Sequence, residues 1–414
     1  MHIIYNLAIQ FYHVGIRIAA LSSSKAKQWV EGRKNWEAQL VAFNSAHSDQ
    51  VHQDRIWVHC ASLGEFEQGR TLIERIKQQF PTKLILLTFY SPSGYEIRKN
   101  YEPADGIFYL PLDTKRNAKR FIQLAQPSVA VFVKYEFWYH FLSQLHLAQI
   151  PTYLISAVFR PDHIFFKPYG GFFRKLLGYF DHIFVQDRSS LKLLEKVDLS
   201  AISIAGDTRV DRVAQIPKEG KHFPLIDSFV DSAPCLIAGS TWPADEQFLQ
   251  KAIEEALDIN WKVIIAPHDI ADAHLKAIEQ QFPSQLIRYS QLSDPVESSF
   301  RYLLIDNIGM LQVLYRYGKI AYIGGGFGSG IHNTLEPITF GLPVIFGPKY
   351  QKFEEAKQLI QSGGGFTVAN EAELIQTLQL LLEEDSYLTA SQRAKAYITD
   401  NQGGTDKIIA HLFK

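Results

Sequence analysis

Cysteine and net charge are both scarce in this chain of 414 residues. The two cysteines, Cys60 and Cys235, lie far apart and within or beside apolar runs. This excludes a disulfide framework and a zinc site built from paired cysteines, and it favours a reducing compartment. The 42 basic residues nearly balance the 43 acidic ones, whereas nucleic-acid-binding proteins usually have a strong basic excess. We therefore expect no nucleic-acid partner.

A long uninterrupted apolar run is also missing, even in residues 1–22, which come closest to one. Asn6, Gln10, His13 and Arg17 recur every three or four residues and share one face of a helix. A spanning helix needs about 20 predominantly apolar residues, and a secretory signal needs a cleaner apolar stretch. The pattern favours an amphipathic helix lying in a membrane interface, followed by basic residues at Lys25, Lys27, Arg33 and Lys34. A helix packed on the protein's own core and a true membrane span remain alternatives.

The length predicts two domains of roughly 200 residues each. Short apolar runs alternate with helical patterns at 55–62, 83–90, 106–112, 128–135, 151–157, 180–187 and 201–206. After a segment with three prolines at 213–234, the alternation restarts at 235–240, 261–268, 284–290, 302–306, 319–325, 343–348 and 365–370. Such runs predict parallel sheets covered by helices on both faces. We expect an α/β fold of two doubly wound Rossmann-like domains facing across a cleft, with a lead-in over 1–40 and domains over 41–215 and 216–414.

The loop after the first predicted strand reads Ser62-Leu63-Gly64-Glu65 and opens a helix. The dipole at a helix N-terminus stabilises a carboxylate as the anion, so Glu65 could act as a general base at the carboxyl end of the sheet. The alternative is structural, because acidic residues are favoured in first turns in any case.

Loops of the second half carry candidates for phosphate binding. Five glycines in residues 324–330 follow a strand and precede a helix. The G-x-G-x-x-G fingerprint does not fit them, but their backbone N–H groups suit a phosphate. Glu336 could reach a ribose diol, and Ser240 ends a strand where an anion could bind. Close packing is the alternative for the glycines. His268 and its acidic neighbours match no strong metal pattern, so we expect no metal.

Residues 159–180 mix aromatic side chains with Arg160, Lys167, Arg174 and Lys175. This mixture suits the edge of an anionic bilayer or a phosphorylated lipid. A buried aromatic loop is the alternative.

Several segments, taken in order, resemble the Kdo transferases. They are GRKNW (32–36), ASLGEFE (61–67), SPSGYE (91–96), EFW (136–138), GIHNTLEP (330–337) and FGP (346–348). These enzymes move 3-deoxy-D-manno-octulosonic acid (Kdo) from CMP-Kdo to lipid A. The resemblance runs over nearly the whole chain. It implies a glycosyltransferase of the GT-B type without a cofactor, at the cytoplasmic face of the cell inner membrane. Its first domain would bind the lipid A precursor and its second the CMP-sugar.

The resemblance also implies roles for particular residues. Glu65 matches the catalytic base, which deprotonates the acceptor hydroxyl in a single displacement with inversion and without a metal. Where many relatives carry a glutamate, a lysine and an arginine, this chain has Lys134, Arg209 and His268, and Glu136 is the candidate substitute for the missing acid. Ser91 and Ser93 join the four basic residues of 159–180 on the acceptor side. The expected contacts with the donor CMP-Kdo are Ser240, Pro267, His268, Ile308, Gly309, Met310, Asn333, Thr334, Leu335 and Glu336.

Two other functions stay open at this point. One is another GT-B enzyme, such as a nucleotide-sugar glycosyltransferase or an epimerase acting on a soluble substrate. The other is a non-catalytic scaffold that binds lipid A or membrane, for which the charge reversal at Lys134 is the only support.

Overall fold

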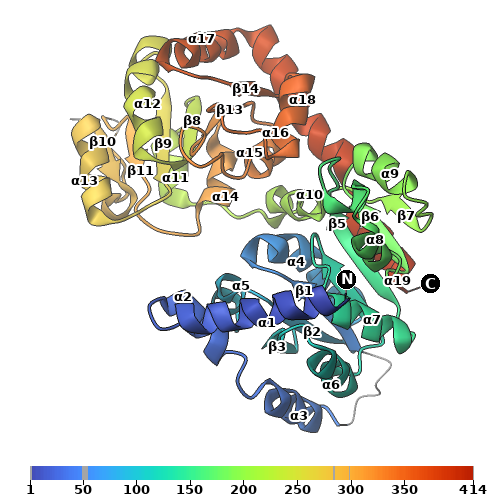
Figure 1. Ribbon diagram of the computed structural model, residues 1–414. Coiled ribbons are helices and arrows are strands. Elements are labelled where there is room, and N and C mark those ends of the chain that lie inside the picture. Colours follow the sequence, from blue (N-terminus) through green and yellow to red (C-terminus); the bar gives the residue numbers. More distant parts are fainter. Residues whose placement is uncertain (1, 49–54, 283–284, 298, 414) are drawn as a thin grey trace. The chain divides into compact units, whose positions relative to one another are not determined.

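The computed structural model describes residues 2–48, 55–282, 285–297 and 299–413 (Figure 1). The chain forms two compact units: unit 1 is Met1–Asp211 with Gly403–Lys414, and unit 2 is Arg212–Gln402. Met1, which begins the expected N-terminal helix, and Ser284, which begins an expected strand, lie outside the described residues.

Unit 1 is built on a seven-stranded parallel sheet, as predicted. Its strands stand in the order β3-β2-β1-β4-β5-β6-β7, and every neighbouring pair is parallel. The strands are β1 (Arg55–Cys60), β2 (Leu84–Phe89), β3 (Gly106–Tyr109), β4 (Val129–Val133), β5 (Thr152–Ala157), β6 (His182–Val185) and β7 (Ile202–Ile204).

Helices cover both faces of this sheet, which is why its strands are apolar throughout. In β1, Trp57 joins the core on one face, whereas Ile56 and Val58 join the core on the other. The helices of the unit are α1 (His2–Ala19), α2 (Ser24–Glu31), α3 (Trp36–Ala46), α4 (Leu63–Gln79), α5 (Pro92–Arg98), α6 (Lys115–Ala125), α7 (Tyr139–Leu147), η2 (Ile164–Phe166), α8 (Gly171–Leu177), α9 (Arg188–Glu195), α10 (Thr208–Val213) and α19 (Gly404–Leu412).

Unit 2 repeats this architecture with a second parallel sheet in the order β10-β11-β9-β8-β12-β13-β14. Its strands are β8 (Cys235–Thr241), β9 (Lys262–Pro267), β10 (Leu286–Arg288), β11 (Tyr302–Leu304), β12 (Ile320–Ile323), β13 (Val344–Phe346) and β14 (Gly365–Thr367). Its helices are η3 (Ile216–Glu219), α11 (Pro224–Val230), α12 (Pro243–Ala256), α13 (Asp272–Gln281), η4 (Tyr289–Gln291), α14 (Leu311–Leu314), η5 (Tyr315–Tyr317), α15 (Leu335–Thr339), α16 (Glu354–Ser362), α17 (Glu371–Leu382) and α18 (Glu384–Asn401).

The end of the chain is divided differently from the predicted ranges. The prediction left all terminal helices in the second domain, but α19 returns to unit 1, where Ile408, Ile409 and Leu412 join the core around α4. Its N-terminus is capped by Asp211, which accepts hydrogen bonds from the N–H groups of Gly403 and Thr405. A Cβ at position 404 would lie 2.2 Å from the carbonyl oxygen of Ala205, so only glycine allows this approach.

The predicted linker over 213–234 is mostly ordered structure within unit 2. It contains η3 and α11, whose Ile226 and Phe229 are buried. The division between the units falls earlier, between Asp211 and Arg212, inside α10.

Each unit holds one cysteine in its sheet. Cys60 ends β1 and Cys235 begins β8, and both are free and buried. Burial raises the pKa of both thiols above the ordinary value.

Candidate functional site

Glu65 lies where the sequence places it, in the first turn of α4 just after β1. Ser62 caps this helix: its hydroxyl accepts a hydrogen bond from the Gly64 N–H and donates one to the Glu65 carboxylate. The carboxylate is therefore held at the carboxyl end of the central strand, where ligands of such sheets bind. Glu65 stays partly exposed, so a substrate hydroxyl can reach it.

Lys134 and Arg209 gather around a buried carboxylate, Asp207, at the same end of the sheet. Arg209 donates to Asp207 through its backbone N–H and through its guanidinium, with Nε at 2.9 Å. Burial alone would raise the pKa of Asp207, but Arg209 and, more weakly, Lys134 hold it below the usual value. Gln68 of α4 also reaches Asp207, at 3.4 Å. The two cations that replace the family's usual residues thus share one anion beside the helix of Glu65.

Glu136 is tied into a buried network rather than offered to a substrate. Its carboxylate accepts hydrogen bonds from His59 Nε2 at 2.9 Å and Trp138 Nε1 at 2.6 Å. The other imidazole nitrogen of His59 lies 2.8 Å from the Thr88 hydroxyl. His59 is fully buried and Glu136 nearly so. The suggestion that Glu136 replaces the acid missing at 134 gains no support from these contacts.

Ser91 and Ser93 open α5, directly after β2. Ser91 is the N-cap, and its hydroxyl lies 2.9 Å from that of Ser93. Both side chains are at the carboxyl end of the strand next to β1, which keeps them on the same edge as Glu65.

In unit 2, a buried carboxylate joins the end of β8 to the glycine-rich loop after β12. Asp245 in α12 accepts hydrogen bonds from the N–H groups of Trp242 and Gly325 and from the Tyr322 hydroxyl, all at 2.9 Å. Burial raises the pKa of this carboxyl. The loop approaches the β8 turn so closely that a Cβ at Gly324 would lie 2.2 Å from the carbonyl oxygen of Ser240. Ser240 itself has a left-handed φ of 54°.

Three aromatic rings stack beside this loop. His268 stacks on both Trp242 and His332, with ring centroids 4.6 and 4.5 Å away. Trp242 Nε1 donates a hydrogen bond to His332 Nε2 at 3.0 Å. Because an indole N–H can only donate, Nε2 of His332 must be unprotonated. Burial, and then the neighbouring His268, also lower the pKa of His332. The stack therefore presents a flat aromatic surface of the kind that a nucleobase binds.

The remaining predicted donor residues lie on the same edge of the second sheet. Pro267 ends β9, and Ile308, Gly309 and Met310 precede α14, with Gly309 at φ 98°. Thr334 is fully buried, and its hydroxyl has no hydrogen-bond partner among the described residues. Asn333, Leu335 and Glu336 lie at the start of α15, where Asn333 accepts a hydrogen bond from the Leu335 N–H.

Helix α1 is attached to unit 1 through polar side chains. Tyr5 donates to the carboxylate of Asp113, which also accepts from the N–H groups of His140 and Phe141 at the start of α7. Asn6 lies 2.6 Å from the His140 ring. Burial raises the pKa of Asp113 to about 6. The large apolar side chains of α1 point away from the protein: Ile3, Ile4, Leu7, Phe11, Val14 and Ile18 are all exposed.

The aromatic and basic segment 159–180 adjoins the beginning of α1. The Phe172 ring of α8 lies 5.4 Å from His2 and 5.9 Å from Tyr5. Tyr169, Arg160 and Lys175 are exposed, whereas Lys167 is partly covered. Arg174 donates to the carbonyl groups of Phe165 and Lys167 and thereby folds the segment on itself. Among the helices that the structure describes, none is long and apolar enough to cross a membrane.

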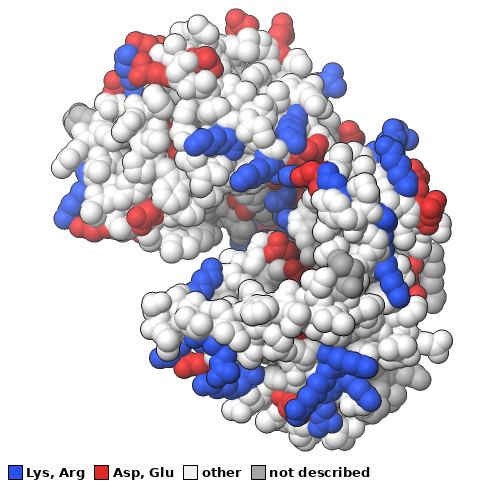
Figure 2. Space-filling view, in the orientation of Figure 1, with Lys and Arg blue, Asp and Glu red and all other residues white. Residues whose placement is uncertain are grey.

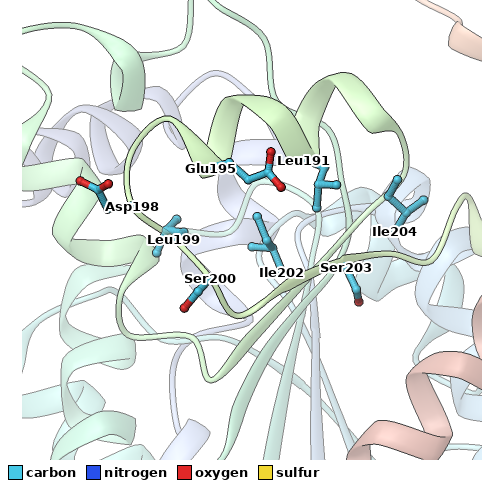
Figure 3. Close-up of a pocket in the computed structure, with 8 residues that line it drawn as sticks. All are labelled: Leu191, Glu195, Asp198, Leu199, Ser200, Ile202, Ser203 and Ile204. Carbon is cyan, nitrogen blue, oxygen red and sulfur yellow. The ribbon is translucent and has the colours of Figure 1, made fainter.

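The sequence did not reveal that Asp113, Asp245 and Trp242 contribute to these sites, because their hydrogen-bond partners lie far away in the chain. A cavity was also missed. It has a volume of about 650 Å³, between α9 and the edge strand β7 (Figure 3). None of the predicted site residues lines it; its lining residues are Leu191, Glu195, Asp198, Leu199, Ser200, Ile202, Ser203 and Ile204.

Comparison with known proteins decides between the functions left open by the sequence. Residues 34–212 match the family model described as 3-deoxy-D-manno-octulosonic-acid transferase (kdotransferase). The 3-deoxy-D-manno-octulosonic acid transferase of Aquifex aeolicus is 29% identical over 349 residues, which cover 82% of this chain and 89% of that one. That of Haemophilus influenzae is 25% identical, with 86% and 85% covered. The chain is similar to Kdo transferases over most of its length, and these matches identify a glycosyltransferase, as predicted.

Solved structures of other enzymes share the fold. The UDP-GlcNAc 2-epimerase of Neisseria meningitidis matches with a TM-score of 0.62 and 14% identity, over 86% of this chain and 98% of that one. MurG of Acinetobacter baumannii matches with a TM-score of 0.55 and 11% identity, over 86% and 98%. At this identity the likeness shows the GT-B fold alone, whereas the sequence relatives, all Kdo transferases, favour transfer over epimerisation.

Proposed function

We propose that this glycosyltransferase moves Kdo from CMP-Kdo to a lipid A precursor, with inversion and with Glu65 as the general base. The observation that supports this most directly is the position of Glu65, capped by Ser62 at the carboxyl end of β1. Lys134, Asp207 and Arg209 stand at the same edge of the sheet.

In the proposed reaction, the acceptor hydroxyl gives its proton to the Glu65 carboxylate while its oxygen attacks the anomeric carbon of Kdo. The bond from that carbon to the CMP phosphate breaks, and its electron pair leaves with CMP. A single displacement inverts the anomeric centre. Arg209 and Lys134 place positive charge where negative charge develops on the leaving group or on the Kdo carboxylate.

Unit 2 supplies the groups suited to the nucleotide. The ring stack of Trp242, His268 and His332 fits a base, and the N–H groups of the glycine-rich loop fit a phosphate. The Thr334 hydroxyl, which has no hydrogen-bond partner among the described residues, would contact the sugar-phosphate. Glu336 would contact the ribose. Because backbone groups and cationic side chains can hold the phosphate, we expect that no metal or other cofactor takes part and that a chelator leaves the rate unchanged.

For location, we propose peripheral association with the cytoplasmic face of the cell inner membrane through α1. The helix contacts unit 1 through Tyr5 and Asn6 and turns apolar side chains outward, with Ile3 75% and Phe11 74% exposed. This orientation is the one expected of a helix that lies in a membrane interface. Basic and aromatic residues of 159–180 adjoin it.

The decisive experiment measures transfer of Kdo from freshly generated CMP-Kdo to a lipid A precursor. Glu65→Gln should lower the rate on the order of 1,000-fold while circular dichroism shows an intact fold. Glu67→Gln is the matched control, because Glu67 lies on the same helix but pairs with Arg98. Full activity of Glu65→Gln would reject the base assignment. No transfer by the wild type with intact substrates would reject the reaction.

A further inference from the structure

A cavity of about 290 Å³ lies beside α1, and basic side chains share its lining with tryptophan and aliphatic side chains. His13 and Arg17 of α1 form one wall, Trp29 of α2 and the following Arg33 and Lys34 another. Asn117 of α6 contributes to the far side. No function assigned above uses this space.

The cations at the mouth of the cavity have no anionic partner. Arg17 and Lys34 are exposed, and neither forms an ion pair within the described part of the chain. None of the lining residues that the structure describes carries a carboxylate. The adjoining helix α6 adds exposed Lys115, Arg116 and Lys119, and Figure 2 shows Lys and Arg side chains gathered over this part of unit 1.

Deeper in the wall, Arg33 provides a fixed positive charge. Its guanidinium donates to the carbonyl groups of Leu110, Trp29 and Tyr90, at 2.8, 3.0 and 2.6 Å. It lies over the Trp29 ring, 3.7 Å from the centroid. Burial lowers the pKa of Arg33 to about 10, so the group still carries its charge at neutral pH. Three carbonyl bonds use only three of its five donors.

The cavity opens along one side of the apolar face of α1. His13 and Arg17 occupy the strip of this helix between the side that faces unit 1 and the exposed apolar side. If the apolar side lies in the acyl region, this strip lies at the level of the lipid headgroups. A lipid could then place its chains against the exposed Phe11 and Ile18 and its phosphate among the cations.

We propose that this cavity binds the phosphate of an anionic bilayer lipid, one lipid per chain. This inference rests on the proposed membrane association but adds to it a defined, saturable site for one headgroup. A guanidinium and an ammonium group are the usual ligands of such a phosphate. The bound lipid would fix α1 in the plane of the bilayer.

The test uses the full chain and a lipid that is soluble on its own, dihexanoyl phosphatidic acid, below its critical micelle concentration. Calorimetry should show saturable binding of one molecule per chain, insensitive to added CMP. Arg17→Gln with Lys34→Gln should weaken this binding roughly 10-fold or more, because two charge-assisted contacts are lost. Lys25→Gln with Lys27→Gln removes the same charge from exposed positions of α2 outside the cavity and should leave the affinity unchanged.

Three outcomes would overturn the proposal. They are no binding by the wild type, an equal loss of affinity in both double variants, or inorganic phosphate that displaces the lipid and binds with the same affinity. The third would identify a site for free phosphate instead. A separate arm tests the membrane proposal through sedimentation with phosphatidylglycerol vesicles. Phe11→Ser with Ile18→Ser should abolish sedimentation but retain dihexanoyl phosphatidic acid binding. The proposed membrane association and the proposed lipid site in the cavity can therefore be rejected independently of each other.

Discussion

Each unit contains one buried aspartate held in the same way, and the two perform different tasks. Asp113 in unit 1 and Asp245 in unit 2 both accept two backbone N–H groups and one tyrosine hydroxyl. Burial raises the pKa of both. In unit 1 the tyrosine comes from α1, so the aspartate fastens a peripheral helix. In unit 2 the N–H groups come from Trp242 and Gly325, so it fastens the loops of the proposed donor site.

Asp113 and Asp245 illustrate how a buried carboxylate can organise the surrounding segments without taking part in the transfer reaction. Its cost of desolvation is offset only while all its hydrogen bonds are made. Any change at these two positions should therefore affect what each aspartate holds in place: helix α1 in unit 1 and the loops of the proposed donor site in unit 2.

The largest effect is expected from Asp245→Ala. It leaves two N–H groups and the Tyr322 hydroxyl without a partner, which should destabilise unit 2 by about 3 kcal/mol and lower CMP affinity on the order of 100-fold. Hydrogen exchange should become faster in residues 320–330 and calorimetry should show the loss of CMP binding. Asp245→Asn, which keeps one acceptor, should be milder. If Asp245→Ala binds CMP normally, the loops do not depend on this residue.

Asp113→Asn should change how stability depends on pH. A carboxyl whose pKa rises from 3.8 to about 6 on folding takes up a proton, so its contribution favours the fold at acidic pH and is lost as the pH rises through that window. The stability of the variant relative to wild type should thus increase from pH 4 to pH 7, on the order of 2 kcal/mol. Urea unfolding at both pH values measures this. Asp162→Asn, at an exposed position, serves as the control and should show no such trend.

The two tyrosines provide a smaller, matched pair of changes. Tyr5→Phe and Tyr322→Phe each remove one hydrogen bond to a carboxylate and should each cost about 1–2 kcal/mol locally. Tyr5→Phe should expose residues 1–22 to proteolysis while CMP affinity stays normal, and Tyr322→Phe should do the reverse. Identical phenotypes would show that the aspartates do not act within their own units.

The smallest effect is expected from Trp242→Phe, which keeps the ring but removes the N–H that binds His332. Without this donor, Nε2 can take a proton, so the pKa of His332 should rise. Nitrogen chemical shifts of the imidazole report both its tautomer and its pKa. The same tautomer in variant and wild type would mean that the indole does not fix it.

The sheets could be predicted because each strand is marked by an apolar run in its own local sequence. Residues 129–133 are apolar without interruption, and they form β4, whose side chains are buried on both faces. Glu65 was predictable for the same local reason, since the Ser62 cap lies three residues before it. The return of α19 was not, because its core contacts are with residues more than 200 positions earlier in the chain.

The aspartate clusters were unpredictable for a related reason. Tyr5 lies 108 residues from Asp113, and Tyr322 lies 77 residues from Asp245. At such separations, the sequence contains no local pattern from which either hydrogen bond could be predicted. The polar stripe of α1 was noticed, but its contact with His140 depends on where α7 begins in the folded unit.

The two cysteines give this protein a reporter in each half. Cys60 is locked in the first sheet and Cys235 in the second, each with a thiol that burial keeps protonated. A thiol reagent can label either one only when the surrounding unit opens. Labelling rates at the two positions, separated by mass spectrometry, would therefore give the opening free energies of unit 1 and unit 2 from a single sample of the unmodified enzyme.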